Sequence, residues 1–388
     1  MRKKLKICHV ITRMIVGGAQ ENTLLTVLGL LEKGHETVLV TGPSPGPEGE
    51  LLKKKDLPQF EIVENEHLLR EINPYHDLMA YFSLKKFFKE RKFDVVHTHS
   101  SKAGIIGRAA AYAAGVPFVT HTVHGQAFHP YEKAWKNFIY KAAERWAATK
   151  CHMIYSVCQA MIDQCVTEKI APAEKYKVVY SGMDLEPFLT SSPDSELRKK
   201  LGIPENRKVV GTVARLFPLK GYEFILPMAE KILKSFPETH FLLVGDGIMR
   251  KGMEEEIEKL GMKDHFTFAG LVRPDEIYKY TALMDILVHL SLREGLPRAV
   301  VQALASGKPA IGFKLDGTPE VIIDGKTGFT ADAENLEQVI SALEKLLADS
   351  GLCTDMGKNG RELVSVNFDW RRMASILEEE YFKHLGVK

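Results

Sequence analysis

The sequence predicts an α/β protein with two domains, each built on a parallel sheet that helices cover on both faces. The chain has 388 residues, about twice the length of a typical domain. Apolar strand-like runs alternate with helix-period segments along nearly its whole length, which is typical of parallel sheets. A segment near the middle, 181–193, is rich in Gly, Ser, Pro and Asp and is predicted to link the domains.

Residues 1–185 are predicted to form the first domain. Its expected strands are 5–11, 37–41, 60–63, 95–97, 118–123 and 153–157, and its expected helices are 19–33, 78–91, 102–114 and 131–149. Residues 194–369 repeat the alternation as a second domain. Its expected strands are 208–214, 241–245, 266–269, 286–290 and 310–313, and its expected helices are 222–236, 248–260, 297–306 and 335–348.

Both halves open with a strand that runs into a loop and then a helix. We therefore expect two Rossmann-like domains that face each other across a cleft, with ligands beyond the carboxyl ends of the strands. The last segment, 370–385, is amphipathic, so a helix within 370–388 is a candidate to pack back on the first domain.

Composition narrows the class of protein. The formal net charge of +2 does not indicate nucleic acid as a partner. Five cysteines without a CxxC pair indicate a reducing compartment and buried or idle thiols. The basic start is predicted to be a strand, not a signal peptide, and no uncharged apolar run has the length of a membrane span. We expect a cytoplasmic protein, with peripheral contact at the inner face of the membrane left open.

Two loops are candidates for binding a phosphate. Gly17 and Gly18 precede a helix, where paired glycines permit positive φ and the free N–H groups favour an anion. A tight turn alone is the alternative. Arg215 and Lys220 follow the first strand of the second half, and a guanidinium fork with an ammonium suits a diphosphate. Here the alternative is a solvated surface pair. Gly245 lies in a Gly-Asp-Gly loop that fits a ligand approach or a turn equally well.

The most specific stretch is SLREGLPRAVVQALASGKP. Glu294 lies in the loop after a strand and can accept hydrogen bonds from sugar hydroxyls. Pro297 suits the first turn of the helix that follows, so the N–H groups of Gly295 and Leu296 are expected at its N-terminus. Gln302, eight positions after Glu294, can bond a ribose diol. The alternative is an acid that stabilises the helix dipole without any ligand.

Histidines cluster after two strands of the first half, in HTHS (97–100) and HTVHGQAFH (121–129). No histidine pair with helical spacing and a carboxylate accompanies them, so no metal site is predicted. His124, followed by Gly125, is interpreted as a sugar-binding residue. His97, His99 and His121 are interpreted as core or loop histidines satisfied by backbone.

Taken in order, these segments resemble the retaining glycosyltransferases of family four, which have the GT-B fold. The resemblance spans nearly the full chain. It rests on GGAQE (17–21), the His-Gly pair, SGMD (181–184), ARLFPLKG (214–221), GDG, AGLV (269–272), REGLPRAVVQALASGKP, GTPEVI (317–322) and the later GKTGF.

The resemblance implies a donor site. Arg215 and Lys220 would bind the donor diphosphate, Glu294 and the amides after it would hold the donor sugar or phosphate, and Gln302 would face the ribose. His124 would lie near the donor sugar, Gly17 and Gly18 would close on the phosphates from the first domain, and Val272 would lie by the base. The family usually needs no metal or other cofactor, so none is expected.

The sequence departs from the family's pattern at two positions. Gln302 stands where the family usually has the second glutamate of its Glu-x7-Glu motif, and an amide can still bond a diol. Ser181 stands where asparagine is common.

The implied function is retaining transfer of a sugar from a nucleotide-sugar, with UDP-sugar as the expected donor, to a hydroxyl acceptor in polysaccharide, lipopolysaccharide or glycolipid synthesis. The alternatives are an epimerase or phosphorylase on the same fold, or an inactive nucleotide-sugar-binding protein.

A lipid-linked acceptor or a growing glycan is expected. The segment 131–150 mixes basic and aromatic residues, which suits either an anionic membrane interface or a domain-packing helix with a solvated basic face.

Overall fold

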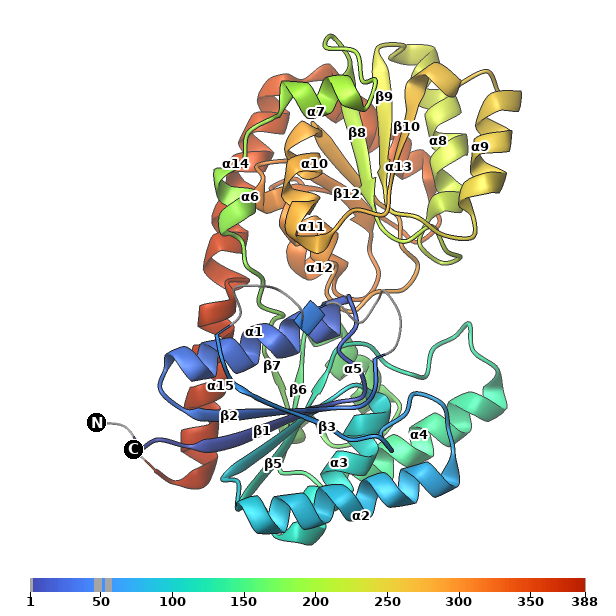
Figure 1. Cartoon of the computed structure of the whole chain (residues 1–388). Helices are drawn as coiled ribbons and strands as arrows, with labels where there is room; N and C mark the ends of the chain where they lie inside the picture. Colours follow the sequence, from blue (N-terminus) through green and yellow to red (C-terminus); the bar gives the residue numbers. More distant parts are fainter. Residues whose placement is uncertain (1–2, 45–50, 53–57, 388) are drawn as a thin grey trace. The chain divides into compact units, whose positions relative to one another are not determined.

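The computed structural model describes residues 3–44, 51–52 and 58–387. The chain divides into two compact units, which are described separately here (Figure 1). Unit 1 comprises Met1–Asp184 and Phe368–Lys388, and unit 2 comprises Leu185–Asn367. Unit 2 is therefore an insertion between the body of unit 1 and its last helix. The segment predicted as the linker contains a short helix, α6 (Glu186–Thr190).

Unit 1 is built on a parallel sheet of seven strands in the order β3-β2-β1-β4-β5-β6-β7. The strands are β1 (Lys6–Ile11), β2 (Glu36–Thr41), β3 (Glu61–Glu64), β4 (Val95–His99), β5 (Phe118–Val123), β6 (Met153–Ser156) and β7 (Tyr176–Val178). The central strands are buried almost throughout, as expected for a parallel sheet covered on both faces. The strand order reverses between β1 and β4, which makes this the topological switch point of unit 1.

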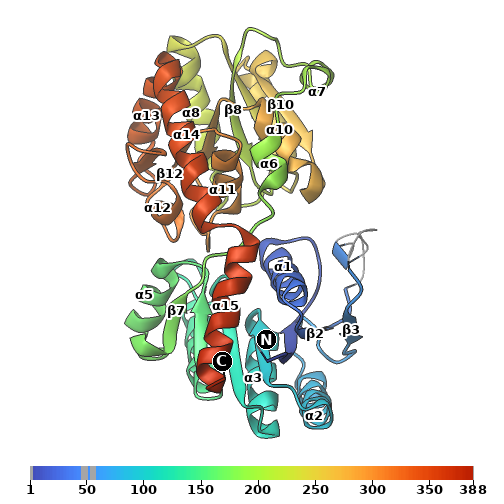
Figure 2. The same cartoon turned by 90° about the vertical axis from the view of Figure 1, so that its left-hand side faces the viewer.

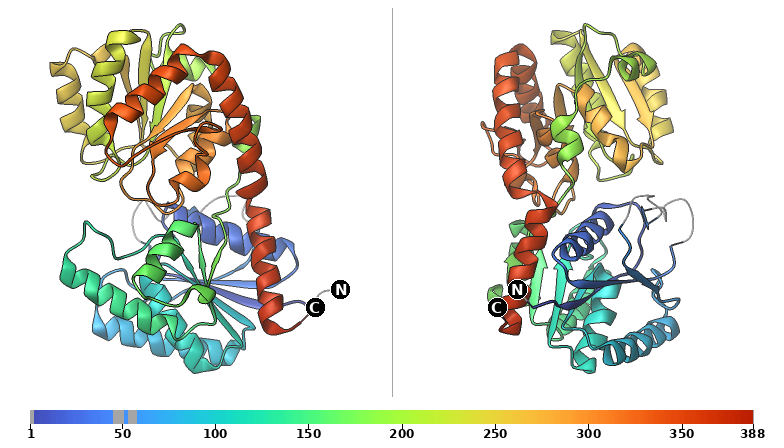
Figure 3. Two further views of the ribbon diagram at one scale, coloured as in Figure 1. Left: turned by 180° about the vertical axis from the view of Figure 1, so that it is seen from behind. Right: turned by 60° about the vertical axis from the view of Figure 1, so that its left-hand side comes forward.

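Helices cover both faces of this sheet. They are α1 (Gly18–Glu32), α2 (Pro74–Arg91), α3 (Ser101–Ala114), α4 (Ala134–Ala148), α5 (Gln159–Thr167) and α15 (Trp370–Leu385). Helix α3 packs against both α2 and α4, and α1 packs against α15 (Figures 1 and 3). Right-handed crossovers place α2, α3 and α4 on one face of the sheet and α1 on the other.

Helix α15 completes the core of unit 1. Trp370, Met373, Leu377 and Tyr381 pack with buried residues of the sheet, among them Phe118. Figure 2 shows α15 running along unit 1 beside α1. The two helices touch closely, because a Cβ on Gly29 would lie 2.4 Å from Cβ of Ala374. The last helix is thus part of the hydrophobic core and not a surface appendage.

Unit 2 has a six-stranded parallel sheet in the order β10-β9-β8-β11-β12-β13. Its strands are β8 (Lys208–Val213), β9 (Thr239–Val244), β10 (Phe266–Gly270), β11 (Ile286–His289), β12 (Ala310–Phe313) and β13 (Gly328–Ala331). Besides α6, its helices are α7 (Ser195–Lys200), α8 (Tyr222–Ser235), α9 (Arg250–Lys259), α10 (Ile277–Leu283), α11 (Arg298–Ala305), α12 (Thr318–Val321), α13 (Leu336–Ala348) and α14 (Ser350–Asn367). The order reverses between β8 and β11, so unit 2 has its own switch point.

The strands and helices that the sequence predicts are present, most of them with shifted ends, and several elements were not predicted. These are the strands β7 and β13 and the helices α5, α6, α7, α10, α12 and α14. The missed strands have three and four residues, too few for a period to be recognised. Among the described residues, no helix combines the length and the apolar composition that crossing a membrane requires.

Candidate functional site

The topology of unit 2 gathers the predicted donor residues at one edge of its sheet. In a parallel sheet, the loops that follow the strands emerge at the same edge and keep the order of the strands. Along this edge the loops carry Val272 after β10, Gly245 after β9, Arg215 and Lys220 after β8, and Glu294 after β11. The loops after β8 and β11 flank the switch point.

Lys220 and Glu294 meet across this switch point. Lys220 Nζ lies 2.6 Å from Glu294 Oε1 and also donates to the Arg293 carbonyl oxygen at 3.3 Å. His289, the last residue of β11, places Nε2 3.4 Å from the same Glu294 oxygen. Burial raises the pKa of the Glu294 carboxyl, but His289 and Lys220 outweigh this effect and bring the pKa down to about 2. Glu294 is therefore a carboxylate at any physiological pH.

A third loop fixes the backbone of Glu294. The Glu294 N–H donates to Oδ2 of Asp316 at 2.8 Å, and the Gly317 N–H donates to the Gly295 carbonyl oxygen at 3.1 Å. Both residues follow β12, the neighbour of β11 in the sheet. Asp316 and His289 were not predicted as site residues. The resemblance pointed to the segment 317–322, and Asp316 directly precedes it.

The loop that carries Lys220 has a restricted backbone. Leu219 has φ +68°, an uncommon conformation for a residue with a side chain, and its carbonyl oxygen accepts from Leu292 N–H at 2.9 Å and Ser291 Oγ at 3.1 Å. Gly221 has φ +84°, and a Cβ there would lie 2.2 Å from the Leu290 carbonyl oxygen. The glycine thus lets the β8 loop press against the end of β11, which brings Lys220 to Glu294.

Arg215 remains open to a ligand. It is exposed, its guanidinium lies 5.4 Å from the centre of the Phe217 ring, and it forms no ion pair with any residue in the described ranges.

Gly245 packs closely against the loop that carries Arg215. It has φ +140°, and a Cβ would lie 1.9 Å from the Ala214 carbonyl oxygen. Close packing of two loops therefore already explains the glycine without a ligand. A direct contact between Gly245 and the donor stays a prediction.

Helix α11 begins one residue later than predicted. Pro297 is its N-cap, with ψ 93°, and not a residue of the first turn. Gly295 and Leu296 therefore lie in the loop before the helix, and Leu296 is buried. Gln302 is the fifth residue of α11 and half-buried. Val272 is half-buried in the loop after β10. Contacts of these four residues with a donor stay predictions.

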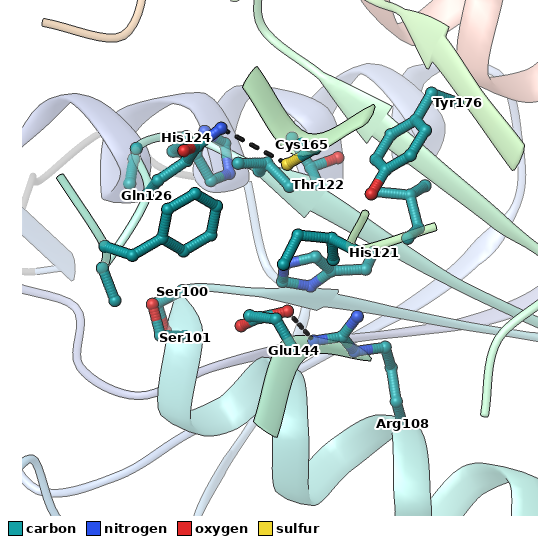
Figure 4. Close-up of a pocket in the computed structure, with 17 residues that line it drawn as sticks. Ser100, Ser101, Arg108, His121, Thr122, His124, Gln126, Glu144, Cys165 and Tyr176 are labelled. Atoms are coloured by element: carbon teal, nitrogen blue, oxygen red, sulfur yellow. Dashed lines mark hydrogen bonds and ion pairs between the residues drawn. The ribbon is translucent and has the colours of Figure 1, made fainter. Parts of the chain in front are cut away.

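Unit 1 has a pocket of about 290 Å³ at the carboxyl ends of β4 and β5 (Figure 4). His124 and Gly125 line it, together with Ala19 from α1 and Ser100 and Ser101 at the start of α3. On another side the fully buried Arg108 forms an ion pair with Glu144 at 2.7 Å. The pocket therefore combines serine hydroxyls, imidazoles and a paired charge with apolar side chains such as Phe128, Ile154 and Ile170, so it offers both polar and apolar surface to a ligand.

Gly17 and Gly18 directly precede Ala19, one of the residues that line this pocket. Gly17 has φ 175°, an extended conformation open to any residue, and Gly18 is the first residue of α1. The prediction that these glycines serve a positive φ is therefore wrong. The N-cap residue of α1 is Gly17, which has no side chain with which to cap the first N–H groups of the helix. A contact of this helix start with phosphate stays a prediction.

Buried histidines form a hydrogen-bonded row that leads to His124. His99 bonds His9 through Nε2 and His124 through Nδ1, both at 3.0 Å. Burial lowers the pKa of His9 to about 3, and burial with the neighbouring histidines lowers the pKa of His97 and His99 well below the usual value. A neutral His99 ring carries one N–H, so it donates to one of these two neighbours and accepts from the other. His99 therefore links the hydrogen-bonding role of His124 to that of His9.

The ligand nitrogens of His9, His97 and His99 lie within 4.8 Å of one another, as in a metal site. The ring of His97, however, bonds Tyr381 Oη at 2.5 Å and Thr122 Oγ1 at 2.6 Å, and both nitrogens of His99 bond other histidines. Metal binding would require these bonds to break, so the arrangement fits a hydrogen-bonded core better. His97 and His99 are satisfied by side chains, and Nδ1 of His121 bonds Thr98 Oγ1 at 2.9 Å, where backbone partners were expected. Nε2 of His9, by contrast, is buried and has no hydrogen-bond partner among the described residues.

Comparison with known families follows the division into units. The model of Glycosyltransferase Family 4 matches residues 16–187, and that of Glycosyl transferases group 1 matches residues 193–363. The chain belongs to the family-four glycosyltransferases. The resemblance inferred from the motifs is thereby confirmed, and the protein is an enzyme of the glycosyltransferase class.

Relatives align along nearly the whole of this glycosyltransferase. A UDP-Gal:alpha-D-GlcNAc-diphosphoundecaprenol alpha-1,3-galactosyltransferase of Escherichia coli is 29% identical over 97% of both chains. An N-acetyl-alpha-D-glucosaminyl L-malate synthase of Bacillus anthracis is 25% identical over 95% of this chain and 94% of its own.

Solved structures confirm the GT-B fold of the glycosyltransferase. Anabaena HepE, crystallised with UDP, superposes with a TM-score of 0.82 at 23% identity, over 98% of this chain and 100% of its own. Sucrose-phosphate synthase from Thermosynechococcus elongatus gives a TM-score of 0.81 at 18% identity, over 98% and 99%.

Proposed function

We propose that this glycosyltransferase moves a sugar from a UDP-sugar to a hydroxyl group of a lipid-linked or growing glycan, with retention at the anomeric carbon. The observation that carries the proposal is the joined pair of Lys220 and Glu294 at the switch point of unit 2, with the exposed Arg215 on the same loop as Lys220. A cation pair beside an ionised carboxylate offers partners for both halves of a sugar nucleotide.

Unit 2 supplies the donor site in this proposal. Arg215 and Lys220 neutralise the diphosphate and stabilise the charge that develops on it as the glycosidic bond to the sugar breaks. Glu294, held ionised, accepts hydrogen bonds from hydroxyls of the transferred sugar. Gln302 bonds the ribose and Val272 lies against the base. No metal or cofactor is proposed, because the two cations supply the charge that a metal would.

Unit 1 supplies the acceptor side. The pocket beside His124 has serine hydroxyls and histidine imidazoles, groups that can orient a hydroxyl nucleophile. The leaving phosphate is proposed to take the proton of that hydroxyl, on the face of the sugar from which the phosphate departs. We propose no covalent nucleophile.

The donor and the acceptor class rest partly on relatives. The Escherichia coli relative is named for UDP-Gal and for an acceptor linked to diphosphoundecaprenol, and the Anabaena structure contains UDP. We propose the same donor nucleotide here, and synthesis of a cell-surface polysaccharide, lipopolysaccharide or glycolipid as the process.

A thermal-shift screen of UDP-, GDP- and ADP-sugars tests the donor. A ligand whose concentration is one hundred times its Kd stabilises the folded state by about 2.7 kcal/mol. The sugar nucleotide that binds can therefore be identified by the rise in unfolding temperature that it causes. We expect UDP-sugars to raise Tm, and a larger rise with GDP- or ADP-sugars would overturn the proposed base. Transfer assays with lipid-linked acceptors then test the reaction. Release of free nucleotide without a glycoside product would indicate an epimerase. Phosphate-dependent release of sugar would indicate a phosphorylase, and binding without turnover would indicate an inactive protein.

A further inference from the structure

Helix α4 presents an apolar face to solvent. Trp135, Phe138, Ile139 and Trp146 recur at helical spacing on one side and are all exposed, with Phe138 at 70% and Trp135 at 61%. The opposite side carries the buried Ala147 and Ala148. The interpretation of this segment as a domain-packing helix with a solvated basic face does not account for the outward stripe, because its large side chains cover no core of unit 1.

Helix α2 repeats this pattern. Tyr75, Leu78, Met79 and Phe82 are spaced i, i+3, i+4, i+7, which also places them on one side of the helix, and they are exposed. The inward side of α2 packs into the core through the residues Ala80, Leu84 and Phe88. Two helices of one unit therefore each turn an apolar stripe away from the core.

The two helices that carry these stripes lie on the same side of unit 1. Helices α2 and α4 both pack against α3 on one face of the sheet, and Figure 1 shows them running along the same side of unit 1. On α3 itself, Tyr112 is exposed. We call the outward-facing residues of α2 and α4 together the apolar face; it consists of Tyr75, Leu78, Met79, Phe82, Trp135, Phe138, Ile139 and Trp146.

Basic side chains border the apolar face. The Lys136 ammonium lies 5.8 Å from the centre of the Trp135 ring, and the Lys150 ammonium lies 5.0 Å from the Tyr112 ring centre and 6.0 Å from that of Trp146. Helix α2 continues beyond its stripe into the exposed Lys86 and Lys89. The one acid within α4, Glu144, pairs with the buried Arg108. Lys136 pairs with Glu132 at 3.4 Å and Lys86 with Glu90 at 3.9 Å, whereas Lys89 and Lys150 form no ion pair with another described residue.

We propose that the apolar face seats unit 1 on the surface of an anionic membrane. Exposed aromatic and aliphatic side chains can enter the boundary between headgroups and acyl chains, while neighbouring lysines stay at the headgroup level. Each basic residue near an anionic surface adds roughly a fivefold gain in partitioning. The charge of the border favours anionic lipid over a neutral surface, and an apolar face spread over two helices suits a plane better than a single groove. The proposal concerns location and does not depend on the proposed reaction.

The tryptophans of the chain make a direct test possible. The protein has three, and Trp370 is buried at 7% exposure, so the exposed emission comes from Trp135 and Trp146. We expect titration with vesicles of phosphatidylglycerol and phosphatidylcholine to shift tryptophan emission to shorter wavelength and to float the protein with the vesicles. Pure phosphatidylcholine vesicles and 0.5 M salt should each weaken binding about tenfold or more, since the lysine border acts electrostatically.

Substitutions separate the membrane from other occupants. The triple variant W135S/F138S/W146S should float at least tenfold less, and Y75S/L78S/F82S should also float less, with unchanged thermal unfolding because the side chains are exposed. As a matched control, I248S/L271S removes side chains exposed at 73% and 84% in unit 2 and should bind like the wild type.

Absence of flotation of the wild type, or flotation of both apolar-face variants at the wild-type level, would overturn the proposal. The proposal would also be overturned if the wild type did not bind vesicles but self-associated with rising concentration, and if the triple variant did not self-associate. The apolar face would then join two copies of the chain. A transfer assay plays no part in this test, so failure of the proposed reaction leaves the result readable.

Discussion

Lys220 and Glu294 are 74 residues apart in the chain, yet their charged atoms lie 2.6 Å apart at the switch point of unit 2. Both side chains are largely shielded from water, with Lys220 at 25% and Glu294 at 18% exposure. A paired charge of this kind is stable only while its partner is present, because removal of one leaves the other without compensation. The site is thus organised before any donor arrives.

Replacing Lys220 by methionine should lower the affinity for a UDP-sugar. A charged hydrogen bond contributes about 1.5–3 kcal/mol, so we expect roughly a 10- to 100-fold higher Kd by titration calorimetry. The matched control is Lys231→Met, which removes a lysine from an exposed ion pair with Glu337 in the same unit. Equal donor affinity in the two variants would refute the assignment of Lys220.

The pH dependence of stability should report the ionised state of Glu294. Its folded pKa of about 2 lies below the ordinary value of 4.5, so its stabilising contribution is complete above about pH 4.5 and is lost as the pH falls toward 2. A shift of this size corresponds to about 3 kcal/mol. Unfolding in denaturant between pH 3 and pH 7 should therefore show a stability gap between wild type and Glu294→Gln that narrows in acid. A gap independent of pH would show that the carboxylate is not stabilised.

Gly221→Ala should damage both stability and donor binding. The added Cβ meets the Leu290 carbonyl oxygen and moves the loop that carries Lys220. Gly202→Ala is the matched control, because Gly202 also has positive φ, +69°, but no atom within 4 Å of the built Cβ. We expect the control to lose about 1 kcal/mol by strain alone and to keep donor affinity. Similar effects of both substitutions on affinity would contradict the role of the close approach.

Gln302→Glu should strengthen donor binding if this residue faces the ribose. A carboxylate accepts hydrogen bonds from a diol more strongly than an amide, by about 1 kcal/mol, which is roughly fivefold in Kd. Titration of UDP alone measures this effect without turnover. An unchanged Kd would place residue 302 away from the nucleotide.

The buried histidines should make unit 1 sensitive to mild acid. Their folded pKa values lie below 6.5, so the unfolded chain binds more protons and stability falls as the pH drops below about 6.5. Each such group contributes up to about 1.4 kcal/mol per pH unit. His9→Asn should reduce the slope of unfolding free energy against pH between 6.5 and 4.5. An unchanged slope would mean that His9 takes up no proton on unfolding.

Sequence reasoning recovered what is local. Apolar strands and the loops after them carry their own pattern, so Arg215, Lys220 and Glu294 could be named as donor-site candidates from spacing and chemistry. The pairing of Lys220 with Glu294 was not predicted, nor was the support from His289 and Asp316, because these contacts join three separate loops. Only the strand order, a non-local property, brings those loops to one edge.

The histidines also show that local features could be predicted and long-range contacts could not. Position after strands suggested that His97 and His99 are core residues, but their partners could not be predicted. His97 bonds Tyr381 of the last helix, 284 residues away, and His99 bonds His9 from the first strand. Helix α14 was missed for a different reason, because its glycines and scattered polar residues weaken the helical period.

The place of α15 in the chain has a consequence for synthesis. The sheet of unit 1 is made first, but the helix that shields Leu5, Ile7 and Phe118 is translated only after the whole of unit 2. During that interval the nascent protein carries an apolar sheet surface without its cover, the kind of surface that aggregates or recruits chaperones. Unit 2 is contiguous in sequence and can fold while the chain is still on the ribosome. Unit 1 can complete its core only after α15 has been synthesised.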